Sequence, residues 1–112
     1  MKITPTPLAG AYVLDIEPHH DERGYFARTF CVDELGALGL DTRVAQASIS
    51  FNQRALTLRG MRFQFPPVAE TKVVRCTQGR LYDVIVDLRP ESPTFGQHVG
   101  VELTAANQRA LY

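Results

Sequence analysis

The most informative stretch for the fold is a run of alternating side chains, Leu56-Thr57-Leu58-Arg59-Gly60-Met61-Arg62-Phe63-Gln64-Phe65. A two-residue alternation predicts a β-strand with one buried face. Arg59 and Arg62 would point to opposite faces of a regular strand, but Gly60 permits a bulge that turns both toward one pocket. A guanidinium offers paired donors to phosphate or carboxylate and stays charged at any useful pH. The stretch therefore indicates an anion site, the alternative being an exposed strand with two solvated arginines.

The flanking sequence predicts more strands and one helix. Strands are expected at residues 12–17, 44–52, 72–77, 80–88 and 98–103, and the turn Gln78-Gly79 should join two of them as a hairpin. Residues 18–24 and 90–96 read as polar loops. A short helix is expected over residues 32–40, where apolar positions fall at helical spacing although Gly36 interrupts them. In residues 44–52 one face is polar, made of Gln46, Ser48, Ser50 and Asn52.

This pattern of many short strands and one short helix predicts a mainly β fold, specifically a jelly-roll β-sandwich whose interior holds a ligand. With 112 residues the chain is expected to form one domain, residues 1–112. Residues 109–112 look like the start of another strand, so the roll is expected to be incomplete at its C-terminus. Because an unpaired sheet edge is normally covered, either a partner chain supplies the rest or the chain is shortened.

Composition narrows the range of partners and compartments. Twelve basic and twelve acidic side chains cancel, so no overall field favours nucleic acid or an anionic membrane surface. The first residues do not resemble a signal segment, and no apolar run approaches the about 20 residues that span a bilayer. We therefore expect a cytoplasmic protein without nucleic-acid or membrane partners. Cys31 and Cys76 are expected to be reduced thiols, with Cys76 in the core.

Six short motifs follow one another along the chain. They are Asp21-Glu22-Arg23-Gly24-Tyr25-Phe26, Gln46-Ala47-Ser48-Ile49-Ser50, Leu58-Arg59-Gly60-Met61-Arg62-Phe63-Gln64, Lys72-Val73-Val74-Arg75-Cys76, Asp83-Val84-Ile85-Val86-Asp87-Leu88-Arg89 and Ser92-Pro93-Thr94-Phe95-Gly96. In order and spacing this series resembles the dTDP-4-dehydrorhamnose 3,5-epimerases. The resemblance implies a cupin-like jelly roll acting on a dTDP-4-keto-6-deoxyhexose in dTDP-rhamnose biosynthesis. It also implies a homodimer formed by exchange of N-terminal strands, with no metal or organic cofactor.

The resemblance also implies roles for individual residues. Arg23 and Arg59 match family arginines that hold the nucleotide diphosphate, and Lys72 matches a lysine beside the keto group of the sugar. An ammonium there would stabilise the enolate formed when a neighbouring carbon loses its proton. Solvated charge is the alternative for Arg23 and Lys72. The other implied substrate contacts are Phe26, which a core role would also explain, and Gln46 and Ser48.

One departure from the family falls on the catalytic base. Where the family has its catalytic histidine, this chain has Arg62. Epimerisation next to a carbonyl needs a base whose pKa lies near the working pH, and arginine, with a pKa above about 12, stays protonated. The tyrosine acid and the carboxylate that orients the histidine belong to a C-terminal half with no counterpart in these residues. Tyr112 matches an aromatic that opens the next strand, so it is expected to be structural.

The sequence therefore predicts a 3,5-epimerase by lineage that is inactive as written. Two other functions remain open. In the first, the chain is a noncatalytic jelly-roll subunit that binds a sugar nucleotide or other anionic ligand, with Arg62 as an additional clamp. In the second, it is an epimerase relative whose chemistry is limited to enolate stabilisation.

No other titratable residue substitutes convincingly for the base. Asp83 and Asp87 could have a raised pKa if they are buried, but pairing with Arg59, Arg62 or Arg75 would lower it, and a structural role of this kind is the expectation favoured for both. His19 and His20 diverge on extended backbone and do not predict a metal site. His98, at a strand start, is expected to be a surface or dimer contact.

Overall fold

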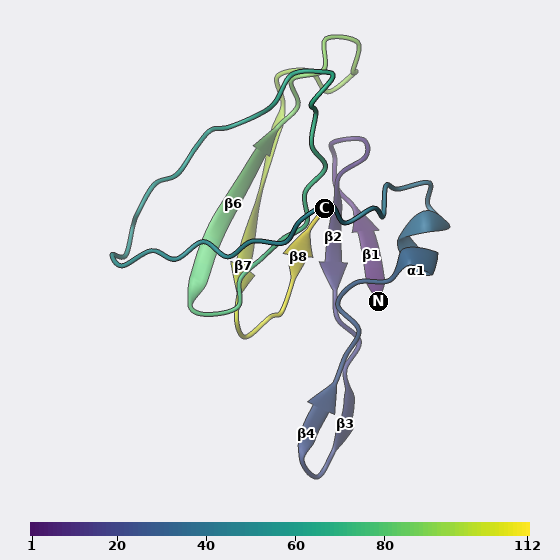
Figure 1. Ribbon diagram of the computed structural model, residues 1–112, viewed down its shortest axis with the longest axis vertical. Coiled ribbons are helices and arrows are strands. Elements are labelled where there is room, and N and C mark those ends of the chain that lie inside the picture. Colours follow the sequence, from purple (N-terminus) through teal and green to yellow (C-terminus); the bar gives the residue numbers. More distant parts are fainter.

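The computed structural model describes residues 1–112 and confirms a mainly β chain with one short helix (Figure 1). The elements are β1 Lys2–Pro5, β2 Tyr12–Asp15, β3 His19–Asp21, β4 Gly24–Phe26, α1 Val32–Gly36, β5 Val74–Arg75, β6 Arg80–Val86, β7 His98–Thr104 and β8 Ala110–Leu111. The helix is five residues long, so no helix is long and apolar enough to cross a membrane.

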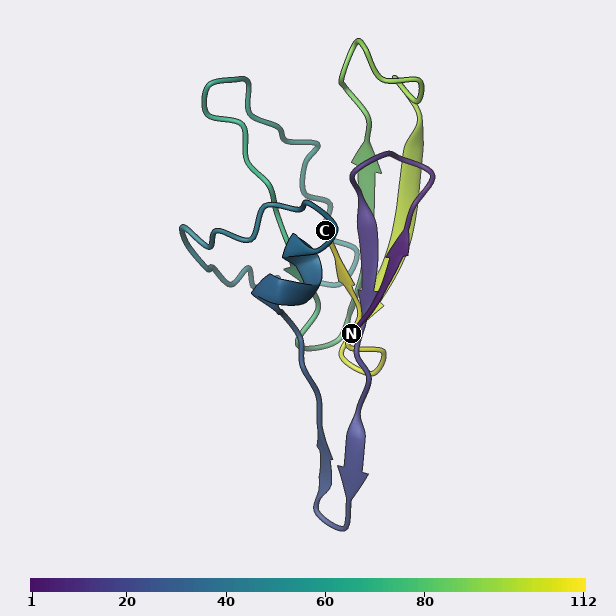
Figure 2. The ribbon, with the colours of Figure 1, turned by 90° about the vertical axis from the view of Figure 1, so that its right-hand side faces the viewer.

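The strands form one four-stranded sheet and two hairpins, all antiparallel. The sheet has the order β1-β2-β8-β5, so the last strand of the chain lies between one near the N-terminus and one from the middle. β6 and β7 form a hairpin of seven residue pairs. β3 and β4 form a smaller hairpin that extends away from the rest of the molecule in both views (Figure 1, Figure 2).

The core consists of two small apolar clusters, one on each side of β8. One cluster contains Leu103, which is fully buried, and Leu111. The other contains Leu14, Leu35 and Ala110. Leu35 is the only buried residue of α1, and its packing against Leu14 and Ala110 holds a helix too short to be stable alone. The remaining residues of the first cluster are Cys76, buried as predicted, and Val101.

The helix is shorter than the sequence pattern predicts. Regular helix ends at Gly36, and the chain continues to Leu40 in turns whose amides bond to carbonyls three or five residues back. Gly39 adopts φ +72°, a left-handed conformation that ends the turn at low cost for glycine. At the other end, the Met1 amino group lies 2.6 Å from a Glu34 carboxylate oxygen and lowers the pKa of that carboxyl.

Strand pairing differs from prediction at three places. Residues 72–77 do not pair with residues 80–88, because β5 keeps two residues and joins β8, while β6 joins β7. Seven residue pairs that include Leu81 with Leu103 and Ile85 with Val99 outweigh the local turn at Gly79. The expected loop at residues 18–24 contains β3 and the start of β4, and β1 was not predicted.

The largest correction concerns residues 44–52 and 56–65, both predicted as strands. Neither contains a strand, and the whole stretch between α1 and β5 runs in long loops that lie beside the sheets without pairing to them (Figure 2). Alternation determines which side chains share a face, but a strand also needs a neighbouring strand to bond its backbone groups. No other strand lies along these residues, so their alternating pattern has no sheet to join.

The loop after β6 is organised by one buried carboxylate. Asp87 accepts bonds from the backbone amide of Arg89 at 3.0 Å and from its guanidinium at 2.8 and 2.9 Å. Ser92 Oγ at 2.5 Å and Thr94 Oγ1 at 2.7 Å donate to Asp87 Oδ2. These donors, the Arg89 guanidinium first, lower the pKa of Asp87 well below its usual range. Asp87 is thus a structural partner, but of Arg89 rather than of the arginines at 59, 62 or 75.

We predict that Asp87→Asn lowers the melting temperature at pH 7 by several degrees, because the amide cannot hold the guanidinium and both hydroxyls. A carboxyl with a lowered pKa in the folded state contributes stability above its unfolded pKa, about 3.9, and loses it as pH falls further. The difference between wild type and variant should therefore shrink below pH 4 in thermal melts. Glu91→Gln, at an exposed position of the same loop, is the control, and equal melts for Asp87→Asn and wild type would contradict this role.

Candidate functional site

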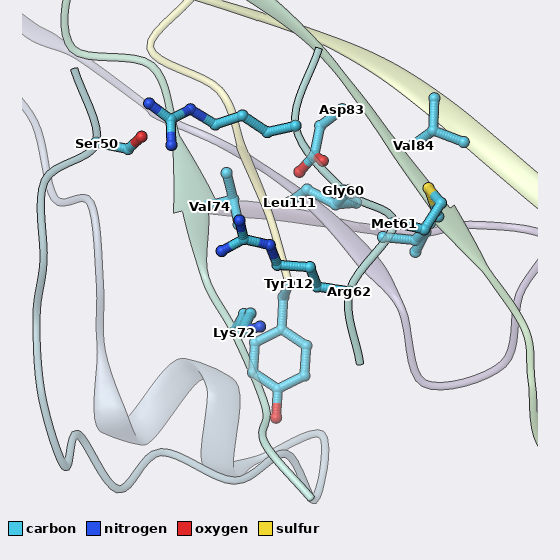
Figure 3. A pocket seen from close by; sticks show the side chains of 12 residues that line it. Ser50, Gly60, Met61, Arg62, Lys72, Val74, Asp83, Val84, Leu111 and Tyr112 are labelled. Carbon is cyan, nitrogen blue, oxygen red and sulfur yellow. The ribbon is translucent and has the colours of Figure 1, made fainter. Parts of the chain in front are cut away.

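The main cavity lies beside β5, β6 and the last two residues of the chain, with a volume of about 340 Å³. The residues that line it come from the loops between α1 and β5, Lys72 among them, and from β5, β6, β8 and the chain end (Figure 3). Its apolar wall is made of Val74, Ile85 and Leu111. Its polar lining consists of Ser50, Arg59, Arg62, Lys72, Asp83 and Tyr112.

The two arginines around Gly60 reach the same cavity, as the sequence predicts. Gly60 has φ +99°, a backbone conformation that L side chains rarely adopt. The chain is not a strand here, so no bulge exists, but Arg59 and Arg62 still line one cavity. Figure 3 shows Arg62, Lys72 and Asp83 around a common space.

The cations of the cavity have few acidic partners. Arg59 donates from Nε to Asn52 Oδ1 at 2.6 Å and from Nη2 to the Phe51 carbonyl at 3.2 Å. Both acceptors are neutral, so they fix the guanidinium without compensating its charge. Arg62 makes no hydrogen bond or ion pair within the chain, whereas Lys72 lies 3.0 Å from Glu70, near the surface. Two guanidinium charges are therefore free to attract an anion.

Asp83 is the one acidic residue in the lining. Burial raises its pKa, and a hydrogen bond with the Val84 backbone only partly opposes the rise. The expectation that an arginine would pair with Asp83 and lower this pKa is wrong, because no arginine or lysine lies within ion-pair distance of it. Two guanidinium groups outweigh one carboxylate, so the lining keeps a net positive charge even when Asp83 is ionised.

Tyr112 has a structural role at the rim of the cavity. Its hydroxyl donates to the Asp41 carbonyl at 3.1 Å, and its ring meets that of Tyr12 edge to face with centroids 6.4 Å apart. Its backbone amide and carbonyl both bond to Tyr12. The hydroxyl that might have been mistaken for a catalytic acid is thus engaged with the backbone.

Four of the residues expected at the site lie elsewhere. Arg23, at the tip of the β3–β4 hairpin, binds Asp21 with a 2.6 Å ion pair and lowers the pKa of that carboxyl. Phe26, on the same hairpin, is 77% exposed and borders a smaller depression beside Met1. The other two residues are Gln46 and Ser48, which are exposed and lie in the loops between α1 and β5.

The cavity also contains residues that the sequence did not assign to it. Ser50 shares the polar face predicted for residues 44–52, so the same alternation would have identified it. The sequence assigns Asp83 to structure because an arginine is expected to pair with it, whereas in the fold it lies on β6 and lines the cavity. No three histidine, cysteine, aspartate or glutamate side chains converge as a set that could hold a metal ion.

Comparison with known proteins agrees with the sequence motifs. The sequence profile described as dTDP-4-dehydrorhamnose 3,5-epimerase matches residues 5–112. The chain belongs to this family. Over the whole chain it is 36% identical to the dTDP-4-dehydrorhamnose 3,5-epimerase of Shigella flexneri, covering 62% of that protein, and 38% identical to that of Salmonella typhimurium, covering 61%. It thus spans about three fifths of the length of these relatives.

Solved structures show the same relation. The dTDP-4-dehydrorhamnose 3,5-epimerase of Elizabethkingia anophelis superposes on the whole chain with a TM-score of 0.95 and 39% identity, 61% of its own length being covered. The Legionella pneumophila epimerase in complex with dTDP-4-keto-L-rhamnose has a TM-score of 0.86 and is 34% identical in sequence. The match covers 98% of this chain and 58% of the Legionella chain. The fold is therefore a cupin-like jelly roll, represented over about three fifths of the relatives' length.

The raised pKa of Asp83 predicts how the cavity will bind an anion. Sulfate keeps its charge between pH 4 and 7, so its affinity should rise severalfold as pH falls through the pKa of Asp83 and the competing carboxylate is neutralised. Asp83→Asn should bind sulfate more tightly at pH 7 and lose the pH dependence. Calorimetric titration would measure both effects, with Glu22→Gln, exposed and outside the cavity, as the control. A wild-type affinity independent of pH would contradict this role of Asp83.

Proposed function

We propose that the chain binds a dTDP-4-keto-6-deoxyhexose as an epimerase-type subunit and does not itself epimerise the sugar. The observation that carries the proposal is Arg62, which lines the cavity beside Arg59 and Lys72 at the position of the family's histidine base. Ligands of related proteins support the substrate class. The Legionella relative was solved with dTDP-4-keto-L-rhamnose, and a 3'-monoepimerase of Streptomyces bikiniensis with dTDP-quinovose.

In this proposal each cation has a distinct role. Arg59 binds the diphosphate, because its guanidinium is already held by Asn52 and Phe51 and does not need to be ordered by the ligand. Lys72 faces the keto oxygen, where an ammonium stabilises negative charge on an enolate. Arg62 cannot accept a carbon-bound proton, because its guanidinium stays protonated at any working pH. It adds a positive charge near the sugar instead.

We further propose that the chain works as a homodimer, through exchange of its N-terminal strands. Arg23 and Phe26 lie on a hairpin that extends away from the chain's own cavity, which is the placement expected of residues that serve a second copy (Figure 2). If residues 44–52 became a strand, Gln46 and Ser48 would lie on the same face as Ser50, which lines the cavity, and would reach the ligand.

We also propose a cytoplasmic location. Neither Cys31 nor Cys76 forms a disulfide, and free thiols are the usual state in a reducing compartment. A similar 4-keto-6-deoxy sugar epimerase of Streptomyces spheroides comes from the novobiocin biosynthetic gene cluster, and a biosynthetic role fits the same compartment.

Ligand-induced stabilisation tests the diphosphate site. dTDP should raise the melting temperature more than thymidine does, since a ligand at a hundredfold excess over its Kd contributes about 2.7 kcal/mol. Arg59→Ala should abolish this difference and change the unliganded melting temperature little, because its side chain is exposed. Arg54→Ala, an exposed arginine outside the cavity, is the control. Equal shifts for dTDP and thymidine in the wild type would show that no diphosphate is gripped.

Loss of catalysis is tested by isotope exchange. Incubation of dTDP-4-keto-6-deoxyglucose with the chain in heavy water should give neither deuterium at C3 or C5 nor inversion, measured by mass spectrometry and NMR. Arg62→His alone should not restore inversion, because an acid and an orienting carboxylate act with the base as one unit. Exchange without inversion in this variant would show a base working without its acid. Inversion by the wild type would overturn the proposal and point to Asp83.

The second candidate function, a noncatalytic subunit that binds a sugar nucleotide or other anionic ligand, differs from the first in making Arg62 a clamp on the anion. The free guanidinium of Arg62 favours it, since an unpaired charge in a lining is suited to hold an anion. The same melts separate the two. If Arg62 is a clamp, Arg62→Leu weakens dTDP binding as Arg59→Ala does. If it only replaces a lost base, Arg62→Leu leaves dTDP binding intact.

A further inference from the structure

Arg62 is the cation of the cavity whose partner in a ligand is still open. It lines the cavity together with Arg59 and Lys72. Its guanidinium stays charged at any working pH and presents paired N–H donors in one plane. A histidine at this position could exchange a proton, whereas an arginine can only attract and hold an anion. Arg62 is therefore suited to bind an anionic group of the ligand.

The diphosphate of a sugar nucleotide is better matched by Arg59 than by Arg62. Arg59 donates from Nε to Asn52 Oδ1 at 2.6 Å and from Nη2 to the Phe51 carbonyl at 3.2 Å. These bonds hold its guanidinium in place before a ligand arrives, which lowers the entropy lost on binding. Arg62 has no such restraint. The diphosphate thus leaves Arg62 available for another group.

Arg62 lies toward the hexose end of the cavity. In the view of Figure 3 its guanidinium lies between the side chains of Asp83 and Lys72, and all three residues line the cavity. Lys72 is the residue proposed to face the oxygen at C4 of the hexose. The exocyclic carbon C6 is attached to C5, the ring neighbour of C4. A long side chain beside Lys72 therefore reaches the substituents of C6.

The chemistry at C6 decides whether Arg62 finds a partner. A 6-deoxy sugar has a methyl group there, against which a guanidinium loses hydration without gaining a hydrogen bond. A hydroxymethyl group offers only a neutral oxygen. A carboxylate offers both of its oxygens in one plane, the arrangement that pairs with a guanidinium through parallel N–H···O bonds. A phosphate is bulkier, and a cavity of about 340 Å³ is already near the lower end of the range for ligand pockets.

The charges of the lining permit an additional anion. Asp83 is the one acidic residue that would repel a ligand carboxylate, and Arg62 offsets it. Burial raises the pKa of Asp83, which weakens the repulsion further. Lys72 contributes less, because its ammonium lies 3.0 Å from a Glu70 carboxylate oxygen. The positive charge available to a carboxylate at C6 is therefore mainly that of Arg62.

We propose that Arg62 makes the cavity selective for nucleoside diphosphate hexuronates, in which C6 of the hexose is a carboxylate. In this arrangement Arg59 holds the diphosphate, Lys72 the oxygen at C4 and Arg62 the carboxylate. Sugar nucleotides with a methyl or hydroxymethyl group at C6 still enter the cavity and bind more weakly. The inference rests on the proposed function for the nucleotide and for the position of the hexose, and it adds the group at C6.

The test compares two ligands that differ only at C6, dTDP-glucuronate and dTDP-glucose, by calorimetric titration of the full chain. The wild type should bind dTDP-glucuronate about tenfold more tightly, because the charge-assisted pair forms only with the carboxylate. Arg62→Gln, at an exposed position, should remove this preference and leave the affinity for dTDP-glucose unchanged. Arg62→Lys should keep only part of it, since an ammonium lacks the planar fork. Arg54→Gln, exposed and outside the cavity, should keep all of it.

Three results would overturn the inference. One is equal affinity of the wild type for the two ligands. Another is an Arg62→Gln variant that binds both ligands more weakly by the same factor, which would place Arg62 on the diphosphate. The third is a preference for dTDP-glucuronate that survives Arg62→Gln, which would assign the carboxylate to another cation.

Failure of the proposed nucleotide site gives a different pattern. In that case dTDP and thymidine stabilise the chain equally, while free glucuronate raises the melting temperature more than glucose does in the wild type and not in Arg62→Gln. This result rejects the proposed function and keeps Arg62 as a carboxylate ligand. Stabilisation by dTDP over thymidine, with equal affinity for dTDP-glucuronate and dTDP-glucose, does the reverse.

Discussion

The pairing of β8 with both β2 and β5 holds the structure together. Two residues make this connection, Ala110 with Leu14 and Arg75, and Leu111 with Val13 and Val74. The side chain of Ala110 belongs to one apolar cluster and that of Leu111 to the other. Strand pairing and burial of both clusters therefore depend on the same short strand. Without it the β1–β2 pair and β5 would not belong to one sheet.

The cavity depends on that strand as well. Leu111 and Val74 form its apolar wall from adjacent strands, and Tyr112 is kept at the rim by its bonds to Tyr12 and Asp41. Against this fixed wall, the cations are carried by the segment with the least backbone pairing. The site thus combines a rigid apolar side with a charged side whose position is set by side-chain bonds such as that of Arg59 to Asn52. Binding specificity and conformational adaptability are divided between the two sides.

Sequence patterns predicted correctly those features that depend on residues close together in the chain. Residues 98–103 form β7 as predicted, and Arg59 and Arg62 share a cavity as the stretch around Gly60 indicated. Pairing was less accessible, because the choice of β7 over β5 as the partner of β6 depends on residues far apart in the chain. The alternation at residues 44–52 and 56–65 predicted strands, but no other strand of the fold lies beside them. Asp83 shows a related gap, since sequence does not reveal whether an arginine comes within reach of a carboxylate.

The small core has a consequence for how stability varies with temperature. Nine of the 112 residues are buried. The heat-capacity change of unfolding arises mainly from newly hydrated apolar surface, and for a compact domain it is about 12–15 cal/mol/K per residue. A chain that buries so few apolar side chains should have a smaller value and hence a flatter curve of free energy against temperature. Its thermal unfolding transition should consequently be broad, and the free energy of unfolding should fall only slightly on cooling. Most of the heat absorbed on unfolding would come from the few buried residues around β8.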